Sequence, residues 1–560
     1  MKPLWNELRP RLLAIAAFSF VINLLFLAPA IFMLQVFDRV IPSNSRETLT
    51  VLLVGTGIAL VLLLFLDYVR NRVQNLLGSI IDDYLSPPVV KAIVAQSARV
   101  PHGVRSDGMR DITTLRTLFS ANALIALFDA PWVVIYVGVI WLFHPALGMG
   151  SAFAALLMLG LAWLNDRVSR NVLDDLQKEG RRASHYVESS LRNAEVLQVL
   201  GMTDNLLSRW RKLQNKITAS QTSASRRTVS FMALTKFLRQ AIQVLIMALG
   251  AYLVISLEAS AGVMIATTVL LGRAIQPVEQ LVGSWRTLLE SRGAYQRLLA
   301  LSEHFEREEP RVSMPRPAGF LAVDGVAYRP RGSDKLILAS ISFSLQEGEA
   351  LAVLGPSAAG KSTLARLLTG VWPATAGSVR LDGADLAYWP RDQLGPWMGY
   401  VPQDVELFDG TVADNIARLG EVDSEAVIRA AERANAHELI LGLEKGYDTP
   451  VGEQGARLSP GQRQRIALAR ALYGDPRLVI LDEPNANLDG EGEIALARAM
   501  SGLRSEGVTT VVITHRPSLI AHVDKILVLG EGRMQKFGPA SEIMKSLQQQ
   551  AQVILGEKAA

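Results

Sequence analysis

Six apolar stretches, each close to the length that crosses a lipid bilayer in one helix, constrain this chain more than any other feature. A bilayer core needs about 20 apolar residues per helix. All six lie in the first half of the 560-residue chain, at residues 11–34, 49–66, 124–142, 146–164, 240–257 and 260–278. They predict an α-helical membrane domain over residues 1–305. The first stretch could instead be a signal peptide, because Ala28-Pro29-Ala30 resembles a cleavage site, but its apolar core is too long for one.

Charge supports a membrane location and argues against a nucleic-acid partner. The chain carries 57 Lys and Arg against 53 Asp and Glu. Residues 1–310 hold 31 of the basic and 23 of the acidic residues, a net charge of +8, which leaves 26 and 30 for the remainder, a net charge of −4. The basic excess therefore accompanies the apolar half, where lipid headgroups explain it. The absence of cysteine excludes disulfide scaffolds, thiolate metal sites and cysteine catalysis.

The connections between the apolar stretches predict which side of the membrane each faces. Long connections at 67–123 and 165–239 hold 21 Lys and Arg, whereas the three short ones hold only Arg39 and Arg46. The positive-inside rule places the long connections and both termini in the cytoplasm. Helical periodicity in the long connections predicts that the membrane helices continue into the cytoplasm for roughly 40 Å at 1.5 Å per residue. A separate soluble insertion is the alternative.

Composition changes abruptly near residue 306. A charged, Pro-rich stretch at 306–319 predicts a linker, and from 320 to 550 short β-rich runs alternate with helical ones. Such alternation is typical of an α/β domain with a mainly parallel sheet. Within it, a glycine-rich motif follows the apolar run 350–354 and precedes a helical run; it consists of Gly355, Pro356, Ser357, Ala358, Ala359, Gly360, Lys361, Ser362 and Thr363. This is the phosphate-binding P-loop pattern, in which Lys361 would reach the β- and γ-phosphates and Ser362 would bind Mg²⁺.

A second motif, 478–483, is an apolar run that ends in Asp482 and Glu483. A buried strand of this kind would deliver Asp482 to Mg²⁺, and Glu483 would polarise the attacking water as a general base. An ordinary strand terminus is the alternative interpretation. Gln403, after another strand, could bind the metal and the water, and His515 at the end of a third strand could contact the γ-phosphate. Each of these two, taken alone, would be read as a surface or structural residue.

Taken in order, these motifs resemble the nucleotide-binding domain of ATP-binding-cassette (ABC) transporters, and the resemblance covers about residues 320–545. It implies ATP and Mg²⁺ as cofactors, with Mg²⁺ held by Ser362, Gln403 and Asp482. Gln403 matches the Q-loop and His515 the switch histidine. Further ATP contacts are implied for the adenine-stacking aromatic Tyr328, for Ser459, Gly461 and Gln462 of the signature, and for Asp489 of the D-loop. The signature departs from the usual LSGGQ at Pro460, which has no N–H to donate.

One nucleotide-binding domain after six spans resembles a half-exporter, which implies a homodimer with two composite ATP sites. Residues 449–455 resemble an exporter motif, and coupling segments are expected around Arg105–Arg116 and Leu206–Lys212. Residues 33–42 and 128–132 are similar to segments of type I secretion exporters of the protease, lipase and surface-layer kind. Because the chain starts almost directly at the first span, an N-terminal peptidase-like domain is not expected.

This resemblance implies an ATPase of the bacterial inner membrane, surrounded by lipid and with its ATPase domain in the cytoplasm. Its partners would be a periplasmic adaptor, an outer-membrane channel and unfolded protein substrates with C-terminal signals. A lipid or drug exporter with the same ATPase is the alternative. The six spans disfavour a soluble ATPase of DNA repair or translation. An ATP-gated channel is a further alternative, and its flux would not need ATP hydrolysis. The alternative interpretation of the two exporter-like segments is purely structural. In it, Asp129 and Pro131 cap and kink the third span, and Asp38 and Arg39 form an ion pair at the membrane interface.

Overall fold

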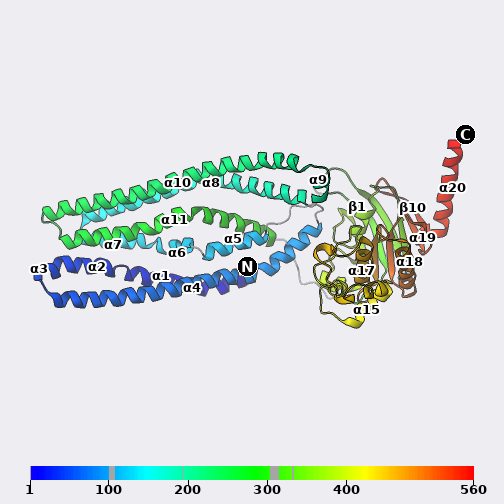
Figure 1. Cartoon of the computed structure of the whole chain (residues 1–560), viewed down its shortest axis with the longest axis horizontal. Helices are drawn as coiled ribbons and strands as arrows, with labels where there is room; N and C mark the ends of the chain where they lie inside the picture. Colours follow the sequence, from blue (N-terminus) through cyan, green and yellow to red (C-terminus); the bar gives the residue numbers. More distant parts are fainter. Residues whose placement is uncertain are drawn as a thin grey trace. The chain divides into compact units, whose positions relative to one another are not determined.

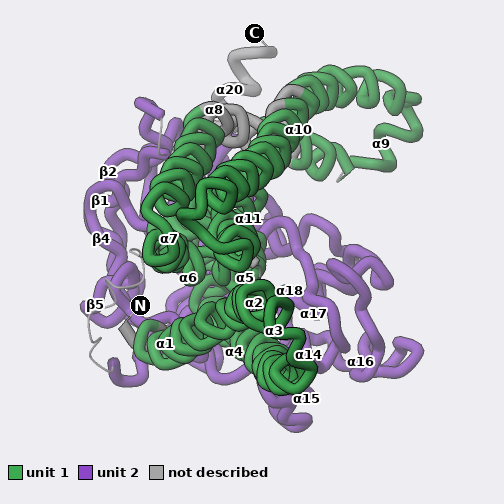
Figure 2. The backbone as a smooth tube through the Cα atoms, turned by 90° about the vertical axis from the view of Figure 1, so that its left-hand side faces the viewer, with its two compact units in different colours: residues 1–97, 102–307 green, residues 98–101, 308–560 purple. Residues whose placement is uncertain are grey.

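The computed structural model describes residues 2–99, 108–120, 122–191, 193–302, 314–330 and 333–559. The chain divides into two compact units, coloured separately in Figure 2. The first comprises Met1–Ser97 with His102–Arg307, and the second comprises Ala98–Pro101 with Glu308–Ala560. Residues 303–313, which include the first part of the expected linker, lie outside the described residues, so the predicted domain boundaries stay predictions.

All described secondary-structure elements of the first unit are helices. Several of its helices are far longer than an average globular helix of 11–12 residues. Its elements are α1 (Lys2–Leu25), α2 (Ala28–Gln35), the π-helical η1 (Val36–Val40), α3 (Ile41–Ser43), α4 (Arg46–Arg99), α5 (Gly108–Ser120), α6 (Asn122–Asp129), α7 (Trp132–Phe143), α8 (Pro145–Leu191), α9 (Ala194–Val199), α10 (Thr203–Ile255) and α11 (Ala261–Ser302).

The described helices match the six spans expected from the sequence in length and apolar composition. Five helical segments of the described chain are long and apolar enough to cross a bilayer: Trp5–Ser43, Arg46–Arg99, Pro145–Asn165, Val229–Ile255 and Ala261–Trp285. The sixth span is the pair α6 and α7, which bends by 40° at the break between Asp129 and Trp132. Pro131 explains the break, since its ring cannot continue a helix and it donates no backbone hydrogen bond.

Long helices continue beyond the apolar windows, as the periodicity of the long connections predicts. α10 has 53 residues, which corresponds to about 80 Å at 1.5 Å per residue. Figure 1 shows α8 and α10 side by side, and α11 packs against α5, α6, α7, α8 and α10. The core of this packing contains the buried side chains of Tyr136, Ile140, Leu270 and Ile275. α11 is therefore the central helix of the unit.

The second unit is an α/β domain with two sheets. A four-stranded antiparallel sheet has the order β2-β1-β4-β5, and a six-stranded sheet has the order β10-β9-β3-β8-β7-β6. The strands are β1 (Leu321–Tyr328), β2 (Leu338–Leu345), β3 (Ala350–Leu354), β4 (Ala376–Leu381), β5 (Ala384–Asp385), β6 (Met398–Val401), β7 (Leu478–Asp482), β8 (Thr509–Ile513), β9 (Lys525–Gly530) and β10 (Arg533–Pro539).

Helices cover the larger sheet, which explains the composition of its strands. The α-helices of this unit are α12 (Lys361–Leu368), α13 (Arg391–Leu394), α14 (Val412–Ile416), α15 (Ser424–Arg433), α16 (His437–Leu441), α17 (Pro460–Leu472), α18 (Gly490–Ser505), α19 (Pro517–Ile520) and α20 (Ala540–Ala559). Every residue of β7 and β8 is buried, as expected for a parallel sheet with both faces covered. Because β3, β6, β7 and β8 run parallel, their carboxyl ends meet at one edge, where the predicted site residues follow the strands.

Candidate functional site

The P-loop, residues 355–363, lies between β3 and α12 as the motif requires. Gly355 has φ of +154°, and a Cβ there would come within 2.3 Å of the carbonyl oxygen of Leu529, so only glycine fits. The Lys361 ammonium lies inside the loop and donates to the carbonyl oxygens of Gly355, at 2.8 Å, and Pro356, at 3.0 Å. The loop therefore wraps around a nearly buried cation at the start of a helix, an arrangement suited to anionic phosphates.

The tip of the loop is open to solvent. Pro356, Ser357 and Ala358 are exposed, while Ala359 is buried against the core. Ala358 and Gly360 both have positive φ values, +65° and +96°, which turn the backbone so that consecutive N–H groups form a concave surface. Thr363 lies in the first turn of α12 and is half-buried.

Ser362 and Asp482 come together although 120 residues separate them. The Ser362 hydroxyl lies 3.3 Å from Oδ1 of Asp482, at the end of β7. Asp482 is 2% exposed, and burial raises the pKa of its carboxyl group, an effect that the Ser362 hydrogen bond partly offsets. Among the described residues, no cluster of three or more His, Asp or Glu side chains could hold a metal ion. Mg²⁺ suits such a sparse site, because it binds through one or two protein oxygens together with nucleotide phosphates and water.

Glu483 lies between two of the predicted site residues. One of its carboxylate oxygens accepts a hydrogen bond from Nε2 of Gln403 at 3.2 Å, and the other lies 3.9 Å from Nε2 of His515. Glu483 has a positive φ of +47°, and its backbone N–H donates to the carbonyl oxygen of Ile513 at 3.0 Å. This unusual conformation turns its side chain out of the line of β7, and such strain is found mainly at functional sites. The fold thus gathers Gln403, Glu483 and His515 from three parallel strands.

The signature residues form the start of α17. Ser459 is the N-cap, and its hydroxyl accepts from the backbone N–H of Gln462 at 3.2 Å, while the Gln462 side chain accepts from the Ser459 N–H at 2.9 Å. Pro460 occupies the first helical position, where a missing N–H costs nothing to the helix and a fixed φ favours it. The departure from the usual signature therefore preserves the helix and removes one possible donor to an anion.

The D-loop packs against this helix start. A Cβ at Gly461 would lie 3.2 Å from the carbonyl oxygen of Asn487. Asp489 is the N-cap of α18 and accepts from the N–H of Gly492 at 2.8 Å. Ser459, Gln462 and Asp489 thus serve as helix caps within their own chain, and the structure does not bring them to the P-loop of that chain. Composite sites in a dimer would have this arrangement.

Tyr328 ends β1 and is 9% exposed. Its ring stacks on Trp372, with ring centroids 5.0 Å apart, and the Arg366 guanidinium lies 4.8 Å from the Trp372 ring. Sequence analysis identified Tyr328 and missed Trp372. An aromatic residue soon after the P-loop helix was the only available signal for it.

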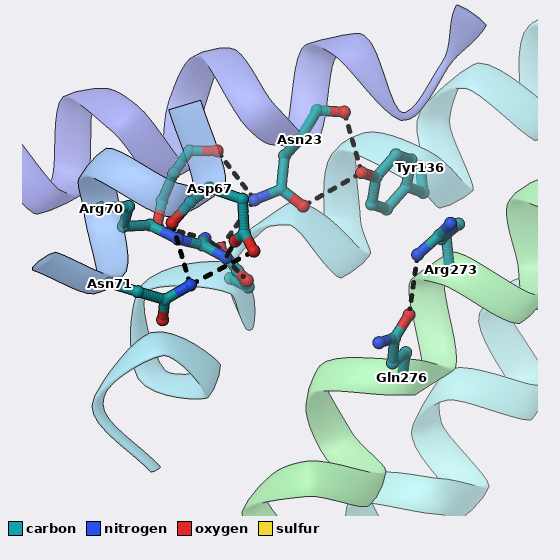
Figure 3. A network of polar contacts seen from close by, with 9 residues as sticks. Asn23, Asp67, Arg70, Asn71, Tyr136, Arg273 and Gln276 are labelled. Carbon is teal, nitrogen blue, oxygen red and sulfur yellow. Dashed lines mark hydrogen bonds and ion pairs between the residues drawn. The ribbon is translucent and has the colours of Figure 1, made fainter. Parts of the chain in front are cut away.

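The first unit, called the transmembrane unit from here on, contains buried polar residues that the sequence analysis did not identify. Asn23 and Arg70 donate to the Asp129 carboxylate. The Tyr136 hydroxyl donates in turn to Asn23, as Figure 3 shows. Polar side chains within apolar spans were the available signal, because such residues are costly in lipid. Asp38, which the alternative interpretation pairs with Arg39, accepts hydrogen bonds from the Ser260 hydroxyl and the Gly262 N–H.

The expected coupling segments are only partly covered. Residues 105–107 of the first lie outside the described residues, and its remainder lies in α5; the second, Leu206–Lys212, lies near the start of α10. The exporter-like motif at 449–455 forms a short irregular segment that ends in a 3₁₀ turn, Glu453–Gly455.

Comparison with known proteins assigns both units. Residues 12–278 match the family model of the ABC transporter transmembrane region, and residues 338–486 match the ABC transporter model. The chain is 40% identical to the type I secretion system ATP-binding protein PrsD of Rhizobium meliloti, over 98% of this chain and 94% of that protein. It is 29% identical to the toxin RTX-I translocation ATP-binding protein of Actinobacillus pleuropneumoniae and 28% to the alpha-hemolysin translocation ATP-binding protein HlyB of Escherichia coli, each over 94% of this chain and 75% of the relative.

The fold has a solved counterpart. A bacterial Atm1-family ABC exporter with ATP bound superposes with a TM-score of 0.82 over 99% of both chains, at 23% sequence identity. The fold, the family models and the 40% identity agree with the P-loop geometry. The chain therefore belongs to the ABC transporters and is a multi-pass membrane exporter that binds and hydrolyses ATP.

Proposed function

We propose that this exporter is the ABC component of a bacterial type I secretion system and moves unfolded proteins with C-terminal signals out of the cytoplasm. The observation that carries this proposal is the 40% identity to a type I secretion ATP-binding protein along 98% of the chain. The alignment behind that figure spans nearly the whole chain, so it includes the membrane helices that would face the cargo.

The ATP site supports a catalytic role for the motif residues. In this proposal, Lys361 and the P-loop backbone bind the phosphates, and Ser362, Asp482 and Gln403 hold Mg²⁺. Mg²⁺ would neutralise charge on the phosphates. Glu483 would accept the proton of the attacking water, and Gln403 and His515, which lie beside its carboxylate, would orient that water and contact the γ-phosphate.

Two chains would form the working unit. Within the described residues, one P-loop domain follows five apolar spans and the bent pair α6 and α7, which makes a sixth. In a homodimer, Ser459, Gly461, Gln462 and Asp489 of one subunit would close over ATP bound to the P-loop and Tyr328 of the other. The position of Ser459 at a helix N-terminus supports this, because helix N-termini attract anions.

The proposed location is the bacterial inner membrane, with the ATPase unit in the cytoplasm. The 21 basic residues of the two long connections support this orientation. The periplasmic partner would be an adaptor that connects the exporter to an outer-membrane channel.

Deletion of the gene in the source bacterium tests the proposal. We expect specific proteins to disappear from the medium and to accumulate in cells. Expression of the wild-type chain should restore them, and expression of Glu483→Gln should not. An unchanged set of extracellular proteins would contradict protein secretion. If small amphiphiles then stimulated the ATPase of the purified exporter, the lipid or drug exporter would be favoured instead.

A further inference from the structure

A buried polar cluster joins three membrane segments within the transmembrane unit (Figure 3). Arg70 of α4 is central to it: Nη2 donates to Asp67 Oδ1 at 2.6 Å, and Nη1 donates to the Ser19 hydroxyl of α1 at 3.1 Å. The same Nη1 lies 3.4 Å from Oδ2 of Asp129, at the end of α6. The side chain of Arg70 is 7% exposed and that of Asp129 is 12% exposed. Buried charges of this kind persist only when they are paired and hydrogen-bonded.

Asn23 of α1 connects the cluster to both halves of the broken third span. Its Nδ2 donates to Asp129 Oδ1 at 2.7 Å, before the break. The Tyr136 hydroxyl, on α7 after the break, lies 2.9 Å from the carbonyl oxygen of Asn23 and 3.0 Å from its Oδ1. α1 therefore fixes the relative positions of α6 and α7 across their 40° bend.

The burial of α4 changes at Arg70. None of the 18 residues in the most apolar window of α4 is buried within the described structure. Counting from the start of the helix, Arg70 is the first buried residue, and it is followed by Gln74, Leu77, Gly78, Ile81, Val89 and Ala92. Residues 46–66 are exposed or at most half-buried within their own chain, whereas the segment after Arg70 contributes buried side chains to the core.

We propose that the Arg70–Asp129 ion pair, together with Asn23, is the anchor about which the first part of α4, residues 46–66, moves relative to the rest of the transmembrane unit. Arg70 and Asp129 are positioning residues in this account. They hold the later part of α4 against α1 and α6, so the movement of the long helix during the transport cycle is confined to the side of the anchor where no side chain of α4 is fully buried. The inference does not depend on which cargo is exported.

Distance measurements between spin labels test the anchor, and the chain suits them because it contains no cysteine. One label pair, Leu76→Cys with Leu127→Cys, joins exposed sites on the anchored part of α4 and on α6; a second pair, Val54→Cys with Val134→Cys, joins the first part of α4 to α7. Each doubly labelled chain is diluted with unlabelled chain in lipid nanodiscs, so that distances within one chain dominate. The nucleotide-free exporter is compared with the exporter trapped by ATP, Mg²⁺ and vanadate.

We expect the 76–127 distance to stay constant between the two states and the 54–134 distance to change. Asp129→Asn should broaden or shift the 76–127 distribution without nucleotide. Asn23→Ala, which keeps the Arg70–Asp129 ion pair, should have a smaller effect on the 76–127 distribution. It is the test variant if Asp129→Asn does not fold. Glu7→Gln, which removes an exposed ion pair with Arg11 on α1, is the matched control and should leave both distributions unchanged. An equal nucleotide-dependent change in both distances would overturn the proposal, as would an unaltered 76–127 distribution in both Asp129→Asn and Asn23→Ala.

Discussion

The guanidinium of Arg297 binds the carboxylate of Asp111 through two parallel hydrogen bonds, from Nε to Oδ2 at 2.8 Å and from Nη2 to Oδ1 at 2.6 Å. Asp111 lies in the first turn of α5 and is 4% exposed, while Arg297 lies near the end of α11. Bidentate pairs of this geometry are the stronger class of ion pair. The contact therefore fixes the segment expected to couple to the ATPase against the last helix of the transmembrane unit.

Asp111→Ala should lower the free energy of unfolding of the transmembrane unit by about 2 kcal/mol, because it leaves a partly buried guanidinium without its carboxylate. Denaturant titration of the exporter in detergent measures the change. Glu425→Ala, which removes an exposed pair with Arg429, is the control and should cost no more than about 0.5 kcal/mol. Equal costs for the two variants would contradict a structural role for the Asp111 pair.

Lys361→Ala should weaken ATP binding at least about tenfold, because it removes the one ammonium group that lies inside the P-loop, and hydrogen bonds to charged groups contribute about 1.5–3 kcal/mol. Titration with a fluorescent ATP analogue gives the affinity. Lys335→Ala, which removes an exposed lysine from the same unit, should bind as tightly as the wild type. Unchanged affinity in Lys361→Ala would exclude the proposed phosphate contact.

Asp482→Asn should reduce ATP hydrolysis by about 100-fold or more, since it removes a charged ligand from the proposed Mg²⁺ site. Chelation of Mg²⁺ should abolish hydrolysis by the wild type, and added Mg²⁺ should restore it. Phosphate release at increasing Mg²⁺ concentration measures both effects. Hydrolysis by Asp482→Asn that reached the wild-type rate with the same Mg²⁺ dependence would place the metal elsewhere.

Pro460→Gly should change two quantities in opposite directions. It restores a backbone N–H that can donate to ATP across the dimer, so the hydrolysis rate should rise severalfold. It also replaces a residue preorganised for the first helical position, so the free energy of unfolding of the ATPase unit should fall by about 0.5–1 kcal/mol. Steady-state hydrolysis and denaturant titration measure the two effects. If neither the hydrolysis rate nor the free energy of unfolding changed, the proline at position 460 would affect neither ATP hydrolysis nor the stability of α17.

Local patterns in the sequence account for much of the fold. Apolar length predicts all six spans, and Pro131 marks the break in the third. The P-loop and the strand before Asp482 are also local, because a strand, a turn and a helix lie within a few residues of one another. The strand-end positions of Gln403, Glu483 and His515 then follow from the parallel sheet, in which carboxyl ends share one edge.

Contacts between distant segments could not be predicted in this way. Asn23 and Asp129 lie 106 residues apart, and Asp111 and Arg297 lie 186 residues apart, so no spacing rule connects them. The sequence singles out Asp129 within residues 128–132, but its partners depend on how α1 and α4 pack. The stacking of Trp372 on Tyr328 likewise depends on the approach of two separate segments.

The most direct test of the account is the turnover of Glu483→Gln in purified exporter reconstituted into nanodiscs. In the proposed mechanism Glu483 is the general base, and its carboxylate lies between Gln403 and His515. The variant should retain bound ATP with Mg²⁺ and lose hydrolysis by about 100-fold or more, whereas the surface variant Glu421→Gln should hydrolyse ATP at the wild-type rate. Wild-type phosphate release by Glu483→Gln would contradict the assignment of this residue and of the hydrolytic site built around it.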